Sequence, residues 1–390
     1  MLRNKNQTHK KRVVLFFSLP LFFLIIIKLV LNSPGGLKKV KTSDCKNISN
    51  NITKNQCWED LLGITLENNG IKEAFLVFAD LYNTDPQFVS SCHSFAHTLG
   101  KAAYKLYTSG KVFDWPSQTA YCGYGFYHGL TELLLQNQGP IEAGKLCDSK
   151  KSQITQVLYD ACYHGIGHGA LSQTASKKDI WGSPPNMVDA ALDICKQATN
   201  DPIQQSRCAS GVFMELGSDY TDNQISLNKK DPLEICRRQG DFGKMDCYTQ
   251  MNGVLNQIAG GKLKESAKFV ETIKEDKYAV EAIETLAAPV INITKTDFRD
   301  DISVCRNLQE RLHLACIKGL VLGFMLRGRP GIEYEDSIKF CSMGIMSESE
   351  KGACFDLVLR HSKSLYADDI FKTICEKVDL RFRANLCSNN

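Results

Sequence analysis

The chain lacks a strong net charge and the short motifs that identify the commonest enzyme classes. Its 47 Lys and Arg residues nearly balance its 43 Asp and Glu residues, which leaves a formal net charge of +4 over 390 residues. The basic residues are scattered, so a nucleic-acid-binding surface is not indicated. The sequence contains no phosphate-binding loop, dinucleotide fingerprint or nucleophile elbow, and these absences weaken the nucleotide-binding and serine-hydrolase classes. No two cysteines have the C-x-x-C spacing typical of a zinc ribbon.

A long apolar run lies near the N-terminus. Residues 13–31 (VVLFFSLPLFFLIIIKLVL) are interrupted only by Ser18, Pro20 and Lys28, and this length is just sufficient for a helix to span a bilayer. The basic tail 1–12 precedes the run, which predicts a cytoplasmic N-terminus and an exported remainder. The run is therefore expected to contact the lipid bilayer as a single transmembrane signal anchor.

Two other signals could account for the N-terminal sequence. A cleaved secretory signal would use 13–27 as its apolar core, but no A-x-A-like cleavage site or lipobox cysteine follows it. A nuclear-type signal in 9–12 (HKKR) is the weaker alternative, because such a basic flank is ordinary before an exported segment. The uncleaved anchor is favoured, followed by a linker over 32–44. The rest of the chain is predicted to lie at the cell surface, in the periplasm or in a secretory lumen.

Cysteine usage supports export. All sixteen cysteines follow the apolar run, and an even number of cysteines in an exported chain is typical of disulfide pairing. Three N-glycosylation sequons agree with this compartment, although such matches are common by chance; they begin at Asn47, Asn51 and Asn292.

The cysteine spacing forms an internal repeat. From Cys147 onward, short gaps of 11 to 15 residues alternate with longer gaps of 21 to 58 residues. The first cysteine of each pair closes an apolar helical stretch, and the second lies in a segment with apolar residues at helical spacing. The pattern predicts an all-α fold, a solenoid-like array of antiparallel helical hairpins, each bridged by one disulfide.

Most of the pairing follows from the short gaps. Cys45 and Cys57 obey the same rule, whereas Cys92 and Cys122 lie 30 residues apart and are paired only by elimination. Both of these last cysteines were expected inside second helices. Free thiols or cysteine metal ligands remain the alternative for some of the sixteen.

The repeat divides the exported part into three regions. Residues 45–260 carry the histidine-bearing repeats, and residues 301–390 form C-terminal helical repeats. Between them, residues 261–300 are highly charged and were interpreted as either an extra exposed helix or a boundary between two halves.

Five of the eight histidines cluster in three consecutive repeats; they are His93, His97, His128, His164 and His168. Residues four apart on a helix lie on one face, so each H-x3-H pair can offer two imidazoles to one ligand. Equivalent positions in a stacked array line a common surface. The five rings are therefore predicted to converge on a transition-metal site.

Two carboxylates share the helical spacing of the histidines. Glu132 lies four residues after His128, and Asp160 lies four residues before His164. Both are candidate catalytic bases for a metal-bound water. Imidazoles with nearby carboxylates favour zinc or iron, with copper as a further candidate. The zincin motif is absent, because Ser94 and Gly165 stand where H-E-x-x-H requires glutamate.

Glycines surround the histidines, and each costs roughly 1 kcal/mol relative to alanine inside a helix. Their number indicates that two helix backbones, or a helix and a ligand, approach closely. The favoured function is a membrane-anchored, metal-dependent hydrolase or oxidase acting on an unidentified small molecule or protein. The alternative is a non-enzymatic repeat scaffold for a partner, with structural histidines. Bis-histidine haem ligation is a third option that lacks the C-x-x-C-H motif.

Overall fold

The computed structural model describes residues 42–110, 115–291, 297–327, 332–383 and 386–387. This part of the chain contains helices and no strand, so the predicted all-α class is confirmed. The predicted basic tail 1–12, the anchor 13–31 and most of the linker 32–44 lie outside the described residues. Within the described ranges, every helix is too short or too polar to cross a bilayer.

The helices follow one another with short connections. The N-terminal half contains α2 (Thr42–Lys46), α3 (Asn51–Asn69), α4 (Ile71–Thr84), α5 (Pro86–Thr108), η1 (Ser117–Ala120), α6 (Gly125–Gln138), α7 (Pro140–Lys150), α8 (Gln156–Ser172), η2 (Gln173–Ser176), α9 (Pro184–Ala198) and α10 (Pro202–Thr221). The C-terminal half contains α11 (Glu234–Arg237), α12 (Asp241–Gln250), α13 (Asn252–Ile258), α14 (Leu263–Glu271), α15 (Asp276–Ala287), η3 (Ala288–Val290), α16 (Arg299–Arg306), α17 (Glu310–Arg327), α18 (Glu333–Cys341), α19 (Glu348–Leu365), α20 (Asp368–Lys377) and η4 (Leu380–Phe382).

Ordinary start signals set several of these boundaries. Asp85 and Asp201 cap α5 and α10 through their side chains, and a proline occupies the first turn of each helix. Thr155 caps α8 by accepting from the backbone N–H of Leu158. At α19, Ser347 and Glu350 form a reciprocal capping box. Of the helices that carry the site, α5, α8 and α10 therefore begin where their sequence places a cap, whereas α6 has no side-chain cap.

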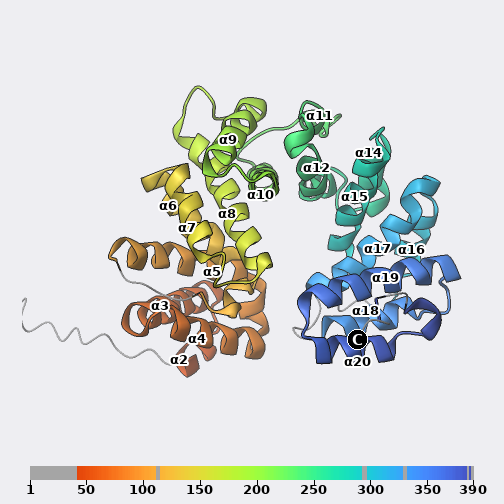
Figure 1. Cartoon of the computed structure of the whole chain (residues 1–390), viewed down its shortest axis with the longest axis horizontal. Helices are drawn as coiled ribbons and strands as arrows, with labels where there is room; N and C mark the ends of the chain where they lie inside the picture. Colours follow the sequence, from red (N-terminus) through yellow and green to blue (C-terminus); the bar gives the residue numbers. More distant parts are fainter. Residues whose placement is uncertain (1–41, 111–114, 292–296, 328–331, 384–385, 388–390) are drawn as a thin grey trace, which may run out of the picture.

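The longer helices stack in chain order. Contacts run from α5 to α6, then to α8, α10, α12, α15, α17 and α19, so each helix of this row packs on the next. A second helix covers most members of the row, as α7 covers α8, α9 covers α10 and α18 covers α19. The described chain bends into an arch, with α2 to α5 at one foot and α18 to α20 at the other (Figure 1). Most contacts between residues distant in sequence therefore join neighbouring members of the row.

Eight disulfides join the cysteines in the predicted pairs, including Cys92–Cys122. The expectation that Cys122 lies in a helix was wrong. Cys122, Gly123 and Tyr124 all have positive φ, and α6 begins only at Gly125. Three successive residues in the left-handed region form a turn that no helix can contain.

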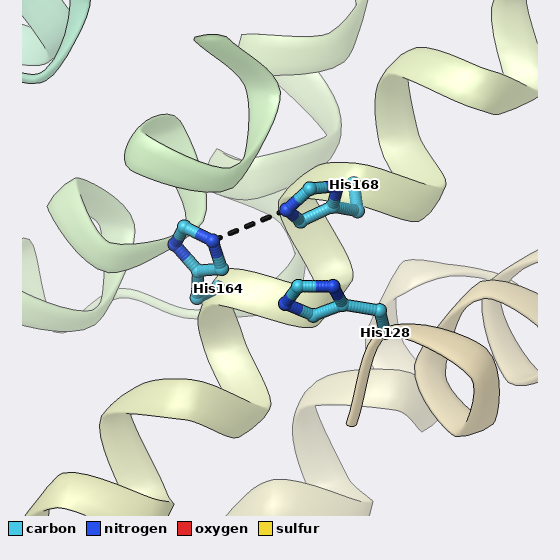
Figure 2. Close-up of side chains that lie close together, drawn as sticks. All are labelled: His128, His164 and His168. Atoms are coloured by element: carbon cyan, nitrogen blue, oxygen red, sulfur yellow. Dashed lines mark hydrogen bonds between the residues drawn. The ribbon is translucent and has the colours of Figure 1, made fainter. Parts of the chain in front are cut away.

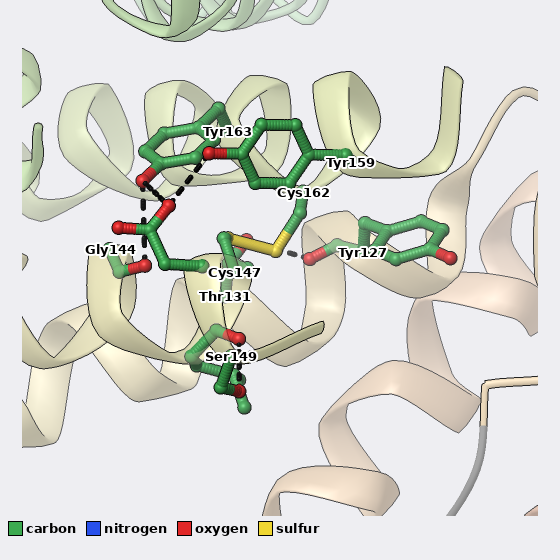
Figure 3. The surroundings of a disulfide bond; sticks show 10 residues. Tyr127, Thr131, Gly144, Cys147, Ser149, Tyr159, Cys162 and Tyr163 are labelled. Carbon is green, nitrogen blue, oxygen red and sulfur yellow. Dashed lines mark hydrogen bonds between the residues drawn. A yellow bond between two sulfur atoms is a disulfide. The ribbon is translucent and has the colours of Figure 1, made fainter. Parts of the chain in front are cut away.

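The disulfide between α7 and α8 shows how a hairpin closes. Cys147 and Cys162 are fully buried, with Cα atoms 5.8 Å apart. Beside this bond, Tyr159 and Tyr163 both donate hydrogen bonds to Asp148 Oδ1, over 2.7 and 2.8 Å (Figure 3). The crosslink and the shared carboxylate hold the two helices at two adjacent points.

The charged region 261–300 contributes the helix pair α14 and α15, which has no disulfide within the described residues. Helix α15 packs against α12 on one side and α17 on the other. The pair therefore continues the row, and the domain boundaries proposed from the sequence remain predictions.

Candidate metal centre

Three neighbouring helices of the row bring the five clustered histidines together. Helix α5 carries His93 and His97, α6 carries His128, and α8 carries His164 and His168. The His128 ring is central: its centroid lies 5.1 Å from that of His93, 6.4 Å from His97, 5.4 Å from His164 and 4.0 Å from His168. Imidazoles contributed by three successive repeats thus form one continuous cluster.

Close backbone contact between α5 and α6 explains two of the glycines. A Cβ atom at Gly100 would lie 2.0 Å from the carbonyl oxygen of Phe126, and one at Gly129 would lie 2.0 Å from that of His97. On each helix, therefore, a glycine packs directly against a backbone carbonyl oxygen of the other helix. No side chain larger than hydrogen fits at either position.

The same reciprocal contact recurs between α8 and α10. A Cβ atom at Gly167 would lie 1.9 Å from the carbonyl oxygen of Cys208, and one at Gly211 would lie 1.9 Å from that of His164. Of the two explanations for the glycines, helix contact therefore accounts for these positions. The contact also draws the histidine-bearing turns of α8 against α10, which carries Met214 and Glu215.

Three of the imidazoles are close enough to share one ion. His128, His164 and His168 each offer a ring nitrogen, and these atoms lie within 4.8 Å of one another (Figure 2). The Nε2 atoms of His164 and His168 are 3.1 Å apart. Tetrahedral zinc with Zn–N bonds of about 2.0 to 2.1 Å separates its nitrogen ligands by about 3.3 Å. Two of the three nitrogens are therefore already at nearly the ligand spacing.

The orientation of His168 is fixed from outside the cluster. Its Nδ1 lies 2.7 Å from Glu215 Oε2 on α10, and Ser172 donates a hydrogen bond of 2.9 Å to Glu215 Oε1. With both carboxylate oxygens accepting, His168 carries its proton on Nδ1, and the lone pair of Nε2 faces His164. A carboxylate that orients a histidine in this way is typical of metal sites.

His128 supplies an unpaired buried nitrogen. Its side chain is 2% exposed, and Nε2 has no hydrogen-bond partner among the described residues. Leaving a buried polar atom unpaired costs roughly 1 to 3 kcal/mol. Native structures contain few such atoms, and each requires an explanation.

Burial keeps the three imidazoles neutral. It lowers the pKa of His164 to about 4, with the positive charge of Arg207 contributing. Burial also lowers the pKa values of His128 and His168 well below the ordinary value, and the neighbouring imidazoles lower them further. Only the neutral form of histidine has a lone pair for a metal, so these side chains are available as ligands at neutral pH.

The α5 histidines lie at the edge of the cluster. His93 is exposed, and its Nδ1 is 2.7 Å from the carbonyl oxygen of Cys122, which fixes the proton on Nδ1. His97 Nε2 lies 3.3 Å from Glu132 Oε2, and Lys101 also pairs with that carboxylate. Burial alone would raise the pKa of Glu132, but the hydrogen bonds from His97 and Lys101 lower it overall. Glu132 is therefore an ionised partner of His97.

Asp160 lies apart from the rings. Its carboxylate accepts hydrogen bonds from Gln156, Gln204 and Arg207, over 2.6, 3.1 and 3.0 Å. The contacts with Gln204 and Arg207 join α8 to α10. The structure thus brings Glu132 to the cluster through His97, whereas the Asp160 carboxylate is bound by amide and guanidinium groups.

Two residues of the site were missed in the sequence. Met214 Sδ lies 3.3 Å from His164 Nε2, and Glu215 contacts His168. Met214 occupies the repeat position held by His128 and His168 in earlier units, but a methionine at that position does not by itself indicate a metal ligand. Glu215, one residue further along, has no place in the histidine register.

A scan against protein-family models and searches of curated proteins and of solved structures found no match to this chain.

Proposed function

We propose that the protein holds one transition-metal ion through His128, His164 and His168, on a helical scaffold stabilised by disulfides. The proposed compartment is extracytoplasmic, behind the anchor 13–31, because eight disulfides require oxidising conditions. The observation that carries the proposal is the buried, unpaired Nε2 of His128 beside two converging Nε2 atoms. A shared cation would satisfy all three nitrogens at once.

The ligand set favours zinc over iron. Non-haem iron oxygenases use two histidines and one carboxylate as direct ligands. Here the two carboxylates of the cluster are already paired with histidine side chains. Glu132 pairs with His97, which is outside the triplet, and Glu215 pairs with Nδ1 of His168, the nitrogen that is not offered to the ion. Three neutral imidazoles are the protein ligands of one class of catalytic zinc site, in which water takes the fourth position.

Copper is the second candidate, and one contact favours it. The thioether of Met214 lies 3.3 Å from His164 Nε2, and thioether ligands select copper(I). Met214 is 39% exposed, so its side chain can rotate without disturbing the core. Metal competition under reducing and non-reducing conditions distinguishes the two ions.

Hydrolysis is the reaction that this arrangement supports best. A zinc ion supplies a nucleophile by lowering the pKa of bound water to about 7. The chain's own contribution would be His97, which accepts the water proton, and Glu132, which orients His97 and stabilises its charged form. Asp160 has no part in this proposal, because its partners hold α8 against α10.

A non-enzymatic scaffold is the competing function. The reciprocal contacts of Gly129 and Gly211 account for the glycine-rich segments by helix packing alone. In that case the histidines would be structural, and the arch would display its surface to a partner. The same experiment decides between the two functions.

The experiment is metal analysis of the full chain purified in detergent micelles. Wild-type protein, stripped with a chelator and dialysed against zinc, is expected to bind one zinc per chain, and cobalt(II) is expected to show tetrahedral absorption. His128→Gln should reduce binding at least 100-fold. His361→Gln is the matched control, because His361 is a half-buried histidine of α19 outside the cluster.

A second variant tests the orientation of the ligands. Glu215→Gln keeps the side-chain shape but weakens the hold on His168 Nδ1, so zinc affinity should fall by about 10- to 100-fold. The exposed Glu142→Gln should leave the affinity unchanged. Wild-type protein that stays metal-free with zinc, cobalt and copper, and is as stable as His128→Gln, would establish the scaffold function instead.

A further inference from the structure

A concavity lies next to the histidine cluster, on the side of Met214. Its volume is about 420 Å³, within the range of ligand sites. Helices α10, α12, α13, α15 and α17 and the short η3 line it. Met214 belongs to this lining and also contacts His164, so the concavity and the proposed metal centre share one side chain.

Among the residues that the structure describes, the lining contains no charged side chain and no aromatic ring. Its polar members are Ser218, Thr221, Thr249, Gln250, Asn252 and Thr285. A charged ligand would lose its hydration here without gaining a partner of opposite charge, which is costly. The concavity therefore selects an uncharged ligand.

The polar lining offers mainly acceptors. The hydroxyl groups of Ser218, Thr249 and Thr285 donate to backbone carbonyls of their own helices, over 3.2, 3.1 and 3.2 Å. Their oxygen lone pairs remain to accept. Gln250 and Asn252 donate through their amide nitrogens to Ser210 Oγ and the Thr249 carbonyl, so their amide oxygens can also accept. A fitting ligand must supply several N–H or O–H donors.

The apolar part of the lining is exposed. Leu326 is 61% exposed and Met214 is 39% exposed, and Leu322 and Pro289 lie beside them in the lining. Covering such side chains contributes about 25 cal/mol per Å² of apolar surface. The fitting ligand therefore combines donor groups with an apolar side chain.

We infer that this concavity binds a short, uncharged peptide segment with an aliphatic side chain, next to the metal centre. Peptide N–H groups would meet the acceptors of the lining, and the aliphatic side chain would pack on Leu326 and Leu322. A neutral sugar also carries many donors, but the lining lacks an aromatic face for a sugar ring. The inference rests on the proposed function only in assigning the peptide as the substrate of the zinc site.

The test is peptide binding by the full chain in micelles, measured by fluorescence polarisation. The probe is a fluorescein-labelled, C-terminally amidated hexapeptide of alanine, leucine and serine. We expect saturable binding to both the zinc-loaded and the chelator-stripped protein. A probe in which two serines become aspartate or lysine should bind at least tenfold more weakly.

Gly253→Leu is the decisive variant. A Cβ atom there meets no atom within 4 Å, so leucine enters the concavity without a backbone clash. Binding should fall at least tenfold, and Leu326→Ser should weaken it several-fold. Gly63→Leu is the control, because Gly63 lies in α3 with equally open space around its Cβ.

The outcomes separate the two proposals. Peptide binding without any metal binding would support the inference and overturn the zinc site. Zinc binding without peptide binding would do the reverse. Binding that Gly253→Leu leaves unchanged, or that a neutral maltohexaose displaces at equal concentration, would overturn the peptide assignment.

Discussion

At the scale of single residues, neighbouring side chains determine whether a buried carboxyl group is ionised. Glu132 is kept ionised by His97 and Lys101. Asp219, one helical turn after Glu215 on α10, has no such partner: its Oδ2 is buried and unpaired among the described residues. Burial raises the pKa of Asp219 to about 7, and the negative charges of Glu215 and Asp222 make smaller contributions in the same direction.

Replacing Asp219 with asparagine should stabilise the protein in a pH-dependent way. The folded carboxyl binds its proton more tightly than the unfolded one, whose ordinary pKa is 3.8. The contribution of Asp219 to stability is therefore present below about pH 4 and is lost as the pH rises through 7. Relative to wild type, Asp219→Asn should gain roughly 1 to 3 kcal/mol at pH 8 and little at pH 4.

Urea unfolding at pH 4 and pH 8, followed by circular dichroism, measures this difference. Asp179→Asn, at an exposed carboxylate, serves as the control and should show no change between the two pH values. An Asp219→Asn variant that is equally destabilised at both pH values would show that the carboxylate is paired in solution.

The sequence predicted the clustered histidines because helical spacing and repeat register are both readable from it. It did not predict the partners across the helix interface. Asp160 shares the stripe of His164 in sequence, yet Arg207 and Gln204 of α10 hold its carboxylate. Glu215 carries no motif of its own. Which side chains face each other depends on how α8 and α10 cross, and spacing within one helix does not specify that.

At the scale of helices, reciprocal glycine contacts set the distance between neighbours. The α8–α10 contact matters most for the site, because the carbonyl that meets Gly211 belongs to His164. Any side chain at position 211 must push the two helices apart, and α10 carries both Met214 and Glu215. Helix spacing and ligand geometry are therefore linked through one glycine.

Gly211→Ala tests this link. The added methyl group would lie 1.9 Å from the His164 carbonyl oxygen, so we expect a loss of about 1 to 3 kcal/mol in unfolding free energy. Zinc affinity should fall in the same variant, because His164 and Glu215 move apart. Urea unfolding and zinc titration measure the two effects.

Gly63→Ala is the matched control for helix propensity. No atom lies within 4 Å of its Cβ position in α3, so alanine should stabilise by up to about 1 kcal/mol. If both variants behave alike, close contact at position 211 is not present in solution.

Glycines in the sequence indicated close contact but left its cause open. The turn before α6 was beyond reach, since Cys122 and Tyr124 adopt positive φ without being glycine. Tertiary constraint, including the bond from Cys122 to Cys92, maintains that conformation. Local propensity favours the opposite sign of φ for both residues.

At the scale of the whole molecule, the row of stacked helices implies that stability is local. Each member contacts its neighbours in the row and its covering helix. Such arrays unfold as a chain of nearest-neighbour units, and a lesion in one unit spreads mainly to the next. The cysteine spacing was sufficient to predict the pairing, because each short loop closes within one hairpin. The arch itself depends on small rotations between successive helix pairs, and the angles of these rotations cannot be predicted from the sequence.

Removing one crosslink should expose this locality. The Cys195–Cys208 bond closes a separation of 13 residues between α9 and α10, and its loss should cost about 3 kcal/mol. In Cys195→Ala/Cys208→Ala, hydrogen exchange should accelerate in α9 and α10 and, less strongly, in α8 and α12. Helices α17 to α19 should keep wild-type protection.

The terminal bond provides the comparison. Cys45→Ala/Cys57→Ala should affect α2 and α3 most and, less strongly, α4 and α5, which α3 contacts. Uniform acceleration across all helices in either variant would show that the molecule unfolds as one cooperative body, contrary to the expectation from its contacts.

The disulfides also affect how the proposed metal ion would enter and leave the histidine triplet. The bonds Cys147–Cys162 and Cys195–Cys208 clamp α8 and α10 to their covering helices on either side of the imidazoles. We therefore expect this region to fold without an ion, in contrast to small zinc domains that fold only when the metal binds. The metal-free protein would keep its fold, and its circular dichroism spectrum would not differ from that of the metal-bound protein. The metal content found in any preparation would then reflect the buffers used in purification, so binding assays should begin with protein that has been stripped and reloaded with a known ion.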